Sequence, residues 1–266
     1  MGVMFSIITV CLNAGNAILE TLNSVLAQEY SDYEIIVKDG ISKDNTLALI
    51  PESEKIRVYS EKDSGIYNAM NQAVKYAAGK YLCFLNAGDV FASAQVLGEV
   101  AKCIERQRAD LYYGDYVRNG VIVRQPAELT SFALFRNPLN HQSMFFSRTL
   151  FSGDVGCYDE SYRILADYEL TVRTFFSNKE MVYIPVTVDI YEGNGVSESK
   201  TGRTRANAEM RRIRKLYYGV KYYVYSLVIA CTLVKLRQWM VKDSTPKWIV
   251  RTYRRIANAI NVRGRK

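Results

Sequence analysis

The 266-residue sequence contains a single histidine and only five cysteines. The cysteines, Cys11, Cys83, Cys103, Cys157 and Cys231, are scattered, and no two of them have the spacing of metal ligands. This usage favours reduced thiols in a cytoplasmic protein over a disulfide framework. The Gly-x-Gly-x-x-Gly pattern of dinucleotide-binding folds is missing, and so is a Walker A loop.

The amino terminus has no basic stretch of the kind that opens a signal peptide, and its apolar run is expected to form a first strand. An apolar run at 222–234 is shorter than the ~20 residues of a membrane-spanning helix. Both absences favour a cytoplasmic protein without a spanning segment.

Acidic residues are nearly absent from the last quarter of the chain. Residues 200–266 contain only Glu209 and Asp243 as acids, against many lysines and arginines, whereas the preceding part is net acidic. Such a basic tail predicts contact with a polyanion. Because an apolar run flanked by Lys221 and Lys235 interrupts it, with Trp239 and Trp248 beyond, we expect a peripheral contact with an anionic membrane face rather than with nucleic acid. A helix packed on the rest of the protein is the alternative.

The first ninety residues alternate between buried strands and amphipathic helices. Strands are expected at 3–9, 33–38, 56–60 and 81–85, and helices after the first, second and third of them. In the helix that begins at Ile66, apolar residues recur at helical spacing through three turns. The alternation predicts an α/β fold with a mostly parallel, doubly wound sheet and helices on both faces.

Each predicted strand ends in a polar loop on the same edge of the sheet. Asp39, Asp63 and Asp89 follow successive strands, and ligands of open α/β sheets bind beyond the carboxyl ends of strands. A carboxylate such as Asp89 at this edge suits a hard divalent cation that takes further ligands from phosphates. The alternative is a structural role, either closing a turn or, for Asp63 or Ser64, capping a helix.

Four linked motifs in the first half resemble the family 2 glycosyltransferases, which have the GT-A fold. They are Phe5-Ser6-Ile7-Ile8-Thr9-Val10-Cys11-Leu12-Asn13, Ile36-Val37-Lys38-Asp39-Gly40 with the following Ser42 to Thr46, Ser60 to Asn71, and Phe84-Leu85-Asn86-Ala87-Gly88-Asp89. A later similarity covers residues 141–197. The resemblance implies a GT-A catalytic domain at 1–200, with a nucleotide-sugar-binding half at 1–92 and an acceptor-binding half at 93–200. A basic, partly apolar helical tail follows at 201–266.

The resemblance also implies roles for individual residues. The donor, a nucleotide-diphosphate sugar and in particular a UDP-sugar, would lie against Thr9, Cys11, Asn13, Asp39, Asp63, Asn71 and Asn86. Asp89 would bind a divalent metal, Mn²⁺ or Mg²⁺, with Asn86 in place of the first acid of the family's Asp-x-Asp motif. Lys38 stands where the family often has an acid before Asp39.

The second half is expected to supply the acceptor side. Two antiparallel strands at 111–115 and 121–124 are expected around a turn at 118–120. The lone histidine, His141, is assigned to the acceptor side by the resemblance, although a lone histidine is often a satisfied buried side chain. A glycine-bearing loop at 189–197 is expected to close over the donor phosphates with Ser197, or to be a linker that leaves the domain.

A catalytic base is required by single displacement at the anomeric carbon, because the attacking hydroxyl must lose its proton to a carboxylate. Asp167 is expected in the first turn of a helix, where it could simply stabilise the helix dipole. The resemblance assigns it the position of the family's catalytic base, although Ala166 replaces the preceding Glu. Glu169 is the second choice.

The sequence thus predicts an inverting glycosyltransferase that acts on a glycan or lipid-linked acceptor in polysaccharide biosynthesis, at the inner face of the cytoplasmic membrane. A non-catalytic protein of the same fold, which binds nucleotide sugar or glycan or serves in membrane assembly, is the alternative. A nucleotidyltransferase is a third option, but the loop at 11–16 lacks the basic residue that such an enzyme would need.

Overall fold

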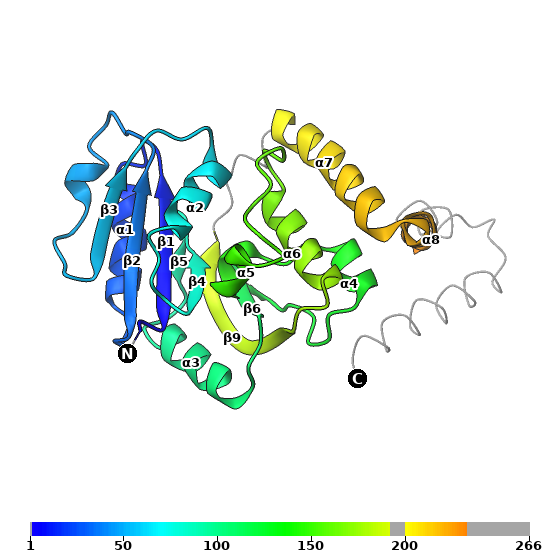
Figure 1. The fold of residues 1–266 in the computed structure, drawn as a ribbon, viewed down its shortest axis with the longest axis horizontal. Helices are drawn as coiled ribbons and strands as arrows, with labels where there is room; N and C mark the ends of the chain where they lie inside the picture. Colours follow the sequence, from blue (N-terminus) through cyan, green and yellow to red (C-terminus); the bar gives the residue numbers. More distant parts are fainter. Residues whose placement is uncertain (1, 192–199, 233–266) are drawn as a thin grey trace.

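The computed structural model describes residues 2–191 and 200–232 (Figure 1). Its amino-terminal half contains four parallel strands in the order β3-β2-β1-β4. These are β1 (Phe5–Cys11), β2 (Tyr33–Asp39), β3 (Ile56–Ser60) and β4 (Tyr81–Phe84). The predicted strands are confirmed, although β1 extends to Cys11, where we expected the loop to have begun.

The connections between these strands are helical. Helix α1 (Asn16–Leu26) follows β1, and α2 (Ile66–Val74) follows β3. Only a short 3₁₀ turn, η1 (Leu47–Leu49), stands where a helix after β2 was expected. The predicted cap of α2 is wrong, because Gly65 occupies the N-cap position with a φ of 140° and no side chain caps the helix. A φ of this size suits glycine, which has no β-carbon to clash with the backbone.

The second half extends the same sheet in the order β4-β8-β6-β9-β5. Strand β8 (Met144–Ser147) is antiparallel to both β4 and β6 (Leu111–Arg118), whereas β9 (Met181–Tyr191) runs parallel to β6. The short β5 (Val90–Phe91) closes the far edge, antiparallel to β9. Strand β7 (Val121–Val123) forms the predicted antiparallel hairpin with β6, and the turn residues Asn119 and Gly120 both have positive φ.

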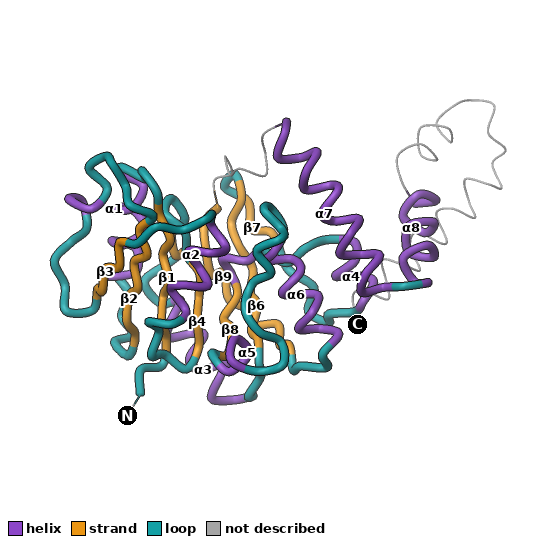
Figure 2. The backbone as a smooth tube through the Cα atoms, turned by 45° about the horizontal axis from the view of Figure 1, so that its top comes forward, coloured by secondary structure: helices purple, strands orange, loops and turns teal. Residues whose placement is uncertain are grey.

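Helices cover both faces of the sheet, as predicted (Figure 2). Alternate residues of β1 enter two different cores, because successive side chains of a strand point to opposite faces. Phe5 and Ile7 pack with α1 and α3 (Val96–Arg106), whereas Ile8 and Val10 pack in the core that contains α2 and α6 (Ala166–Phe176). The remaining helical segments of the second half are α4 (Ser131–Arg136), η2 (His141–Ser143) and α5 (Thr149–Ser152).

The described part of the tail consists of α7 (Lys200–Tyr218) and α8 (Val220–Thr232), separated by Gly219. Figure 1 shows α7 beside α6 and α8 near α4. Tyr222, Tyr225 and Ile229 pack against the core, and the Tyr225 ring meets Phe135 edge to face. The described part of the tail therefore packs on the domain along one face of α8. Trp239 and Trp248 lie outside the described residues. None of the helices in the described residues combines the length and apolar character needed to span a bilayer.

Candidate active site

The carboxyl end of β2 is organised around Asp39, whose side chain is fully buried. Its carboxylate accepts hydrogen bonds from the backbone N–H groups of Ile41 and Ser42 and from the hydroxyls of Ser42 and Ser60. Burial favours the protonated form, but these hydrogen bonds outweigh it and lower the pKa of Asp39. Asp39 is therefore a fixed anion that shapes the loop after β2 and joins it to the end of β3.

The preceding residue, Lys38, joins this loop to the one after β3. Its ammonium group is fully buried, donates to the carbonyl oxygens of Asp39 (2.9 Å) and Glu61 (2.5 Å), and lies 3.9 Å from Oδ2 of Asp63. A β-carbon on Gly40 would lie 2.6 Å from the same Asp63 oxygen, so a larger residue at position 40 would displace the Asp63 carboxylate. Lys38, which stands where the family often has an acid, thus provides a buried counter-charge for Asp63.

The end of β1 supplies the other predicted donor-side residues. Cys11 donates through its Sγ to Asp39, and burial together with the nearby Asp39 charge raises the pKa of this thiol to about 12. Asn13, in a left-handed conformation with a φ of 52°, accepts from the N–H of Lys43 through its side chain. The Thr9 hydroxyl is buried without a hydrogen-bond partner within the described structure. The pairing of β1 with β2 therefore sets Cys11 opposite Asp39 and Thr9 opposite Val37, while Asn13 contacts the loop after β2.

At the end of β4, the chain turns sharply at Asn86-Ala87-Gly88-Asp89. The hydroxyl of Thr21 in α1 accepts from the N–H of Gly88, and the N–H of Asp89 donates to the carbonyl of Asn86. Asp89 is nearly buried, accepts from Gln142 of η2 at 2.9 Å, and has a pKa raised by burial to about 6. The turn thus holds a carboxylate that is poorly solvated in the absence of a cation.

A second acid, Asp189, was not assigned to the site by the sequence reasoning. Residues 189–191 were expected in a loop, but they belong to β9, where Asp189 is paired with Phe91 of β5. Its side chain is fully buried and accepts two hydrogen bonds from Asn140. Burial and the charge of Asp89 raise its pKa to about 8. An acid within the apolar sequence Val-Thr-Val-Asp-Ile-Tyr was the signal that could have found it.

This corner fits a divalent cation by the chemistry of its donors. Oδ1 of Asn86 is shielded from solvent and has no hydrogen-bond partner among the described residues. An orphaned amide oxygen in the same turn as a carboxylate suits Mg²⁺ or Mn²⁺, which use one or two carboxylates and take other ligands from water and phosphate. In residues 2–191 and 200–232, no group of three or more His, Cys, Asp or Glu side chains could hold a metal. A cation here would depend on the substrate for its remaining ligands.

Asp167 lies in the first turn of α6, as predicted. Its Oδ1 is 3.0 Å from the hydroxyl of Tyr67 in α2 and accepts from the N–H of Tyr168 at 2.8 Å. Burial and the charge of Asp167 raise the pKa of Tyr67 well above its usual value, so this hydroxyl keeps its proton and remains a donor. Because α2 begins directly after the Asp63 loop, Tyr67 connects Asp167 to the donor-side edge of the sheet.

Glu169, the second choice for the base, is engaged elsewhere. It is buried, forms an ion pair with Arg173 at 2.8 Å, and accepts from the hydroxyl of Tyr217 in α7. These contacts give Glu169 a structural role in joining α6 to α7. The role of Asp167 as the base stays a prediction.

Two further predicted residues, His141 and Asn71, make contacts around Tyr158. His141 is buried in an aromatic cluster, with its Nε2 2.7 Å from the Tyr158 hydroxyl, and burial lowers its pKa. The same 3₁₀ turn carries Gln142 to Asp89, so His141 helps to fix the segment that contacts this acid. The side chain of Asn71 exchanges two hydrogen bonds with the backbone of Tyr158. Ser197 lies outside the described residues. The donor and acceptor roles of these residues stay predictions.

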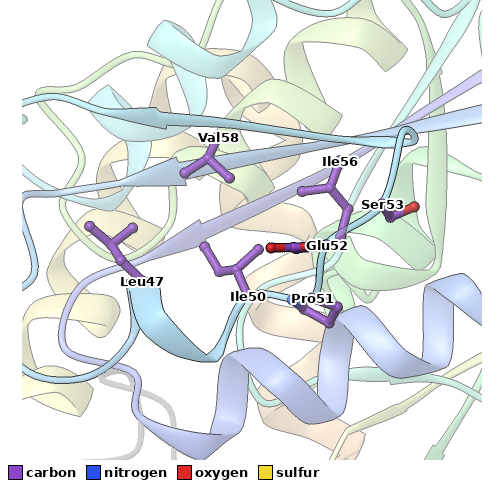
Figure 3. A pocket seen from close by; sticks show the side chains of 7 residues that line it. All are labelled: Leu47, Ile50, Pro51, Glu52, Ser53, Ile56 and Val58. Carbon is purple, nitrogen blue, oxygen red and sulfur yellow. The ribbon is translucent and has the colours of Figure 1, made fainter.

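A hollow on the edge of the sheet lies away from these carboxylates. It is lined by Leu47, Ile50, Pro51, Glu52, Ser53, Ile56 and Val58 (Figure 3). The hollow is open and largely apolar, and none of the predicted site residues lines it. Glu52 is the one charged side chain in this lining, so the hollow lacks the several carboxylates that follow β2, β3 and β4.

Comparison with known proteins supports the reading of these motifs. The chain is 36% identical over 206 residues to a PGL/p-HBAD biosynthesis glycosyltransferase of Mycobacterium bovis, covering 74% of this chain and 80% of the relative. It is 30% identical over 142 residues to the Escherichia coli UDP-Glc:alpha-D-GlcNAc-diphosphoundecaprenol beta-1,3-glucosyltransferase WfgD, covering 50% of this chain and 56% of WfgD.

Two solved structures share the fold. One is residues 1–349 of S. aureus TarS in complex with UDP-GlcNAc, with a TM-score of 0.66 and 19% identity, covering 80% of this chain but slightly less than two thirds of that fragment, 66%. The other is the mannosyltransferase PcManGT of Pyrobaculum calidifontis in complex with GDP-Man and Mn²⁺, with a TM-score of 0.62 and 15% identity, covering 98% of this chain and 81% of that one. Glycosyl transferase family 2 matches residues 6–161. Taken with the sheet and its carboxylate-bearing edge, this match shows that the chain belongs to the family 2 glycosyltransferases and has the GT-A fold.

Proposed function

We propose that this glycosyltransferase transfers a sugar, with inversion, from a UDP-sugar to a hydroxyl of a lipid-linked or glycan acceptor in surface polysaccharide synthesis. One observation carries the proposal: Asp167 is fixed by Tyr67 on the α2 side of the strand ends, while Asp89 lies at the end of β4. The carboxylate that would accept the proton, Asp167, and the carboxylate that would serve the pyrophosphate, Asp89, are thus separate groups, as single displacement requires.

The donor would lie across the ends of β1 and β2. In this proposal Asp39, held by its hydroxyl and backbone donors, faces the uracil base of the nucleotide. The Lys38–Asp63 pair fixes the adjoining loop. The name of WfgD specifies UDP-Glc as its donor, and the TarS fragment was solved with UDP-GlcNAc. PcManGT was solved with GDP-Man, so a guanosine donor is the competing choice within the same fold. The identity of the chain to WfgD favours uridine.

In the proposed reaction, the acceptor oxygen attacks the anomeric carbon from the face opposite the nucleotide. The acceptor hydroxyl gives its proton to Asp167, the new carbon–oxygen bond forms, and the bond to the phosphate oxygen breaks. The nucleoside diphosphate leaves with the bonding electron pair, and the anomeric configuration inverts. The buried Tyr67 keeps the Asp167 carboxylate in one orientation.

We assign the divalent cation to Asp89, with the orphaned oxygen of Asn86 beside it. When bound, such an ion stabilises the negative charge that develops on the leaving diphosphate. Gln142 holds the Asp89 carboxylate in place through one oxygen. Asp189 lies behind it as a further acid, and its hydrogen bonds from Asn140 fix η2 against β9.

The tail supports a lipid-facing position for the enzyme. On α8, the stripe Val220, Tyr223, Val224 and Leu227 is exposed, at spacings that place the residues on one side of a helix. Three basic residues are also exposed, Arg211 and Lys215 on α7 and Lys221 on α8. An apolar stripe with basic neighbours suits insertion into the headgroup region of an anionic membrane. Peripheral attachment to the cytoplasmic face would bring the active site to a lipid-linked acceptor.

The test is transfer or hydrolysis with a panel of radiolabelled nucleotide sugars, with and without Mn²⁺. We expect a UDP-sugar to be consumed only by the metal-loaded protein. Asp167→Asn should abolish turnover while leaving the dissociation constant for UDP nearly unchanged. Asp154→Asn, at an exposed acid paired with Lys179, is the matched control and should keep full activity. Turnover retained in Asp167→Asn would show that another group is the base, and UDP-sugar binding without any turnover would favour a non-catalytic role.

A further inference from the structure

Glu209 is the only acidic residue between residues 200 and 232, in the most basic part of the chain. It is nevertheless buried, against the usual placement of acids on a charged helix. Its Oε1 accepts from the backbone N–H of Arg163 at 2.9 Å, and its Oε2 accepts from those of Ile164 and Leu165, each at 3.0 Å. One side chain of α7 therefore binds three consecutive amides of a segment more than forty residues earlier.

These three amides lead directly into α6. Leu165 occupies the N-cap position, and no side chain caps the helix there. The first turn is served locally, because the N–H of Tyr168 donates to the carboxylate of Asp167. Glu209 instead binds the three amides that precede the helix, up to the N-cap residue itself. A carboxylate is also the group that the positive end of a helix dipole favours. Glu209 thus anchors from α7 the segment that leads into α6.

The same segment is held from its other side by α2. The Tyr67 hydroxyl, which contacts Asp167, also lies 2.7 Å from the carbonyl oxygen of Ile164. The Arg163 side chain donates to the carbonyl of Ser64 in the loop before α2. Residues 163–165 are therefore fixed through their N–H groups by α7 and through carbonyl and side-chain contacts by α2. Asp167 follows only two residues later.

We propose that Glu209 is a positioning residue for Asp167, and that α7 is in this way a working part of the active site. The proposal rests on the proposed role of Asp167 as the base. Loss of the Glu209 carboxylate frees the three amides, lets the start of α6 shift, and moves Asp167 away from the acceptor hydroxyl. The predicted domain boundary at residue 200 would separate Glu209 from the segment that it holds.

The Arg205–Glu209 ion pair does not account for this arrangement. Arg205 lies 3.3 Å from Oε1 of Glu209, but its side chain is 58% exposed. Exposed ion pairs contribute little to stability, whereas three backbone donors to one buried carboxylate are charge-assisted hydrogen bonds. The negative charge of Glu209 is therefore stabilised chiefly by the amides of residues 163–165.

The experiment compares Glu209→Ala and the milder Glu209→Gln with Asn207→Ala, an exposed neighbour on the same helix. Amide hydrogen exchange of the full-length protein reports on residues 163–168, and calorimetry gives the dissociation constant for UDP. Turnover of the UDP-sugar identified in the panel gives kcat and KM. Glutamine keeps one acceptor oxygen for Ile164 and Leu165, but its amide nitrogen faces the N–H of Arg163, so its effects should be intermediate.

We expect Glu209→Ala to lose protection at residues 163–168 and to lower kcat by roughly 10²-fold, the cost of a displacement of about 1 Å. The dissociation constant for UDP should stay within about twofold of wild type, and Asn207→Ala should match wild type throughout. Unchanged protection in Glu209→Ala would overturn the proposal whatever the activity. A fall in kcat that is fully explained by a smaller fraction of folded protein would overturn it too. Lost protection in a chain whose wild type transfers no sugar would refute the proposed function, and the catalytic meaning of Glu209 with it.

Discussion

The hydroxyl of Tyr67 lies 3.0 Å from Oδ1 of Asp167, across the contact between α2 and α6. This contact joins two halves of the chain that are separated by a hundred residues. Its removal is the most direct test of how the orientation of Asp167 affects turnover.

Tyr67→Phe should lower kcat by about tenfold with little change in UDP binding, because Asp167 and the carbonyl of Ile164 both lose their contact with the hydroxyl and the start of α6 is loosened. Loss of one net hydrogen bond should also lower the free energy of unfolding by about 1 kcal/mol. Steady-state kinetics and urea denaturation measure the two effects. Tyr76→Phe removes a hydroxyl that donates to Glu61 at an exposed position and is the matched control. Equal effects of the two substitutions would argue against a special role for Tyr67.

Lys38→Met should destabilise the protein by about 2–4 kcal/mol, because Asp63 loses its buried counter-charge and two carbonyl oxygens lose a donor. The dissociation constant for UDP should rise, since both loops of the nucleoside side lose their connection. Chemical denaturation and calorimetry give the two quantities. The double variant Lys38→Met/Asp63→Asn should recover part of the stability. If the loss of unfolding free energy in the double variant equals the sum of the losses in the two single variants, the pair is not coupled.

Binding of Mn²⁺ in the presence of UDP should weaken as the pH falls below about 6, the pKa of Asp89 in the metal-free protein. Protons and cation compete for the same carboxylate, so the apparent dissociation constant should rise by up to about tenfold per pH unit. Calorimetry between pH 5 and 8 would follow it. Asp89→Ala should weaken metal-dependent UDP binding at every pH and remove this dependence. Unchanged affinity in Asp89→Ala would exclude Asp89 as the ligand.

Stability of the metal-free protein should fall as the pH rises from about 4 to about 8. Asp89 and Asp189 have folded-state pKa values of about 6 and about 8, above their usual value of 3.8, so the folded state binds more protons in this range than the unfolded chain. Since one pKa unit corresponds to about 1.4 kcal/mol, the loss should be on the order of several kcal/mol. Urea denaturation in a chelator at several pH values measures it. Asp189→Asn should flatten the profile, whereas the exposed Asp154→Asn should not; a profile that stays as steep in Asp189→Asn would refute the assignment.

Binding to vesicles with anionic lipid should depend on the exposed stripe of α8. Tyr223→Ser combined with Leu227→Ser should reduce binding at least tenfold, because two apolar side chains no longer enter the headgroup region. Co-sedimentation with phosphatidylglycerol-containing and with neutral vesicles measures it. The control is Val121→Ser with Ile122→Ser, which are equally exposed apolar residues on β7. Loss of binding in the control, or none in the α8 variant, would argue against this surface.

The parallel half of the fold was predictable because its signals are local. Each buried strand is a short apolar run, and the polar loop after it follows within the same dozen residues. Helix α2 and the Asn119–Gly120 hairpin turn also have signatures inside their own segments. The first turn of α6 was predicted for the same reason, and Asp167 with it.

The antiparallel insertion of β8 and the closure by β5 could not be predicted, since pairing between distant segments leaves no periodic signal in either. Asp189 appeared to begin a loop because its burial is created only by β5 and η2. Glu209 gave no signal on a basic helix, as its partners are backbone amides, which every sequence contains. The missing side-chain cap on α6 becomes visible only once α6 is known to begin at Ala166.

The pairing of β5 with β9 brings together residues about a hundred positions apart. During synthesis on the ribosome, the strands that form the nucleoside side emerge first and can assemble early. Asp189, whose pKa the charge of Asp89 raises, joins this corner only after β9 has left the exit tunnel. A nascent chain that ends before residue 181 would therefore contain Asp89 and its partner Gln142 but lack the strand that brings a second buried acid to the same edge of the sheet.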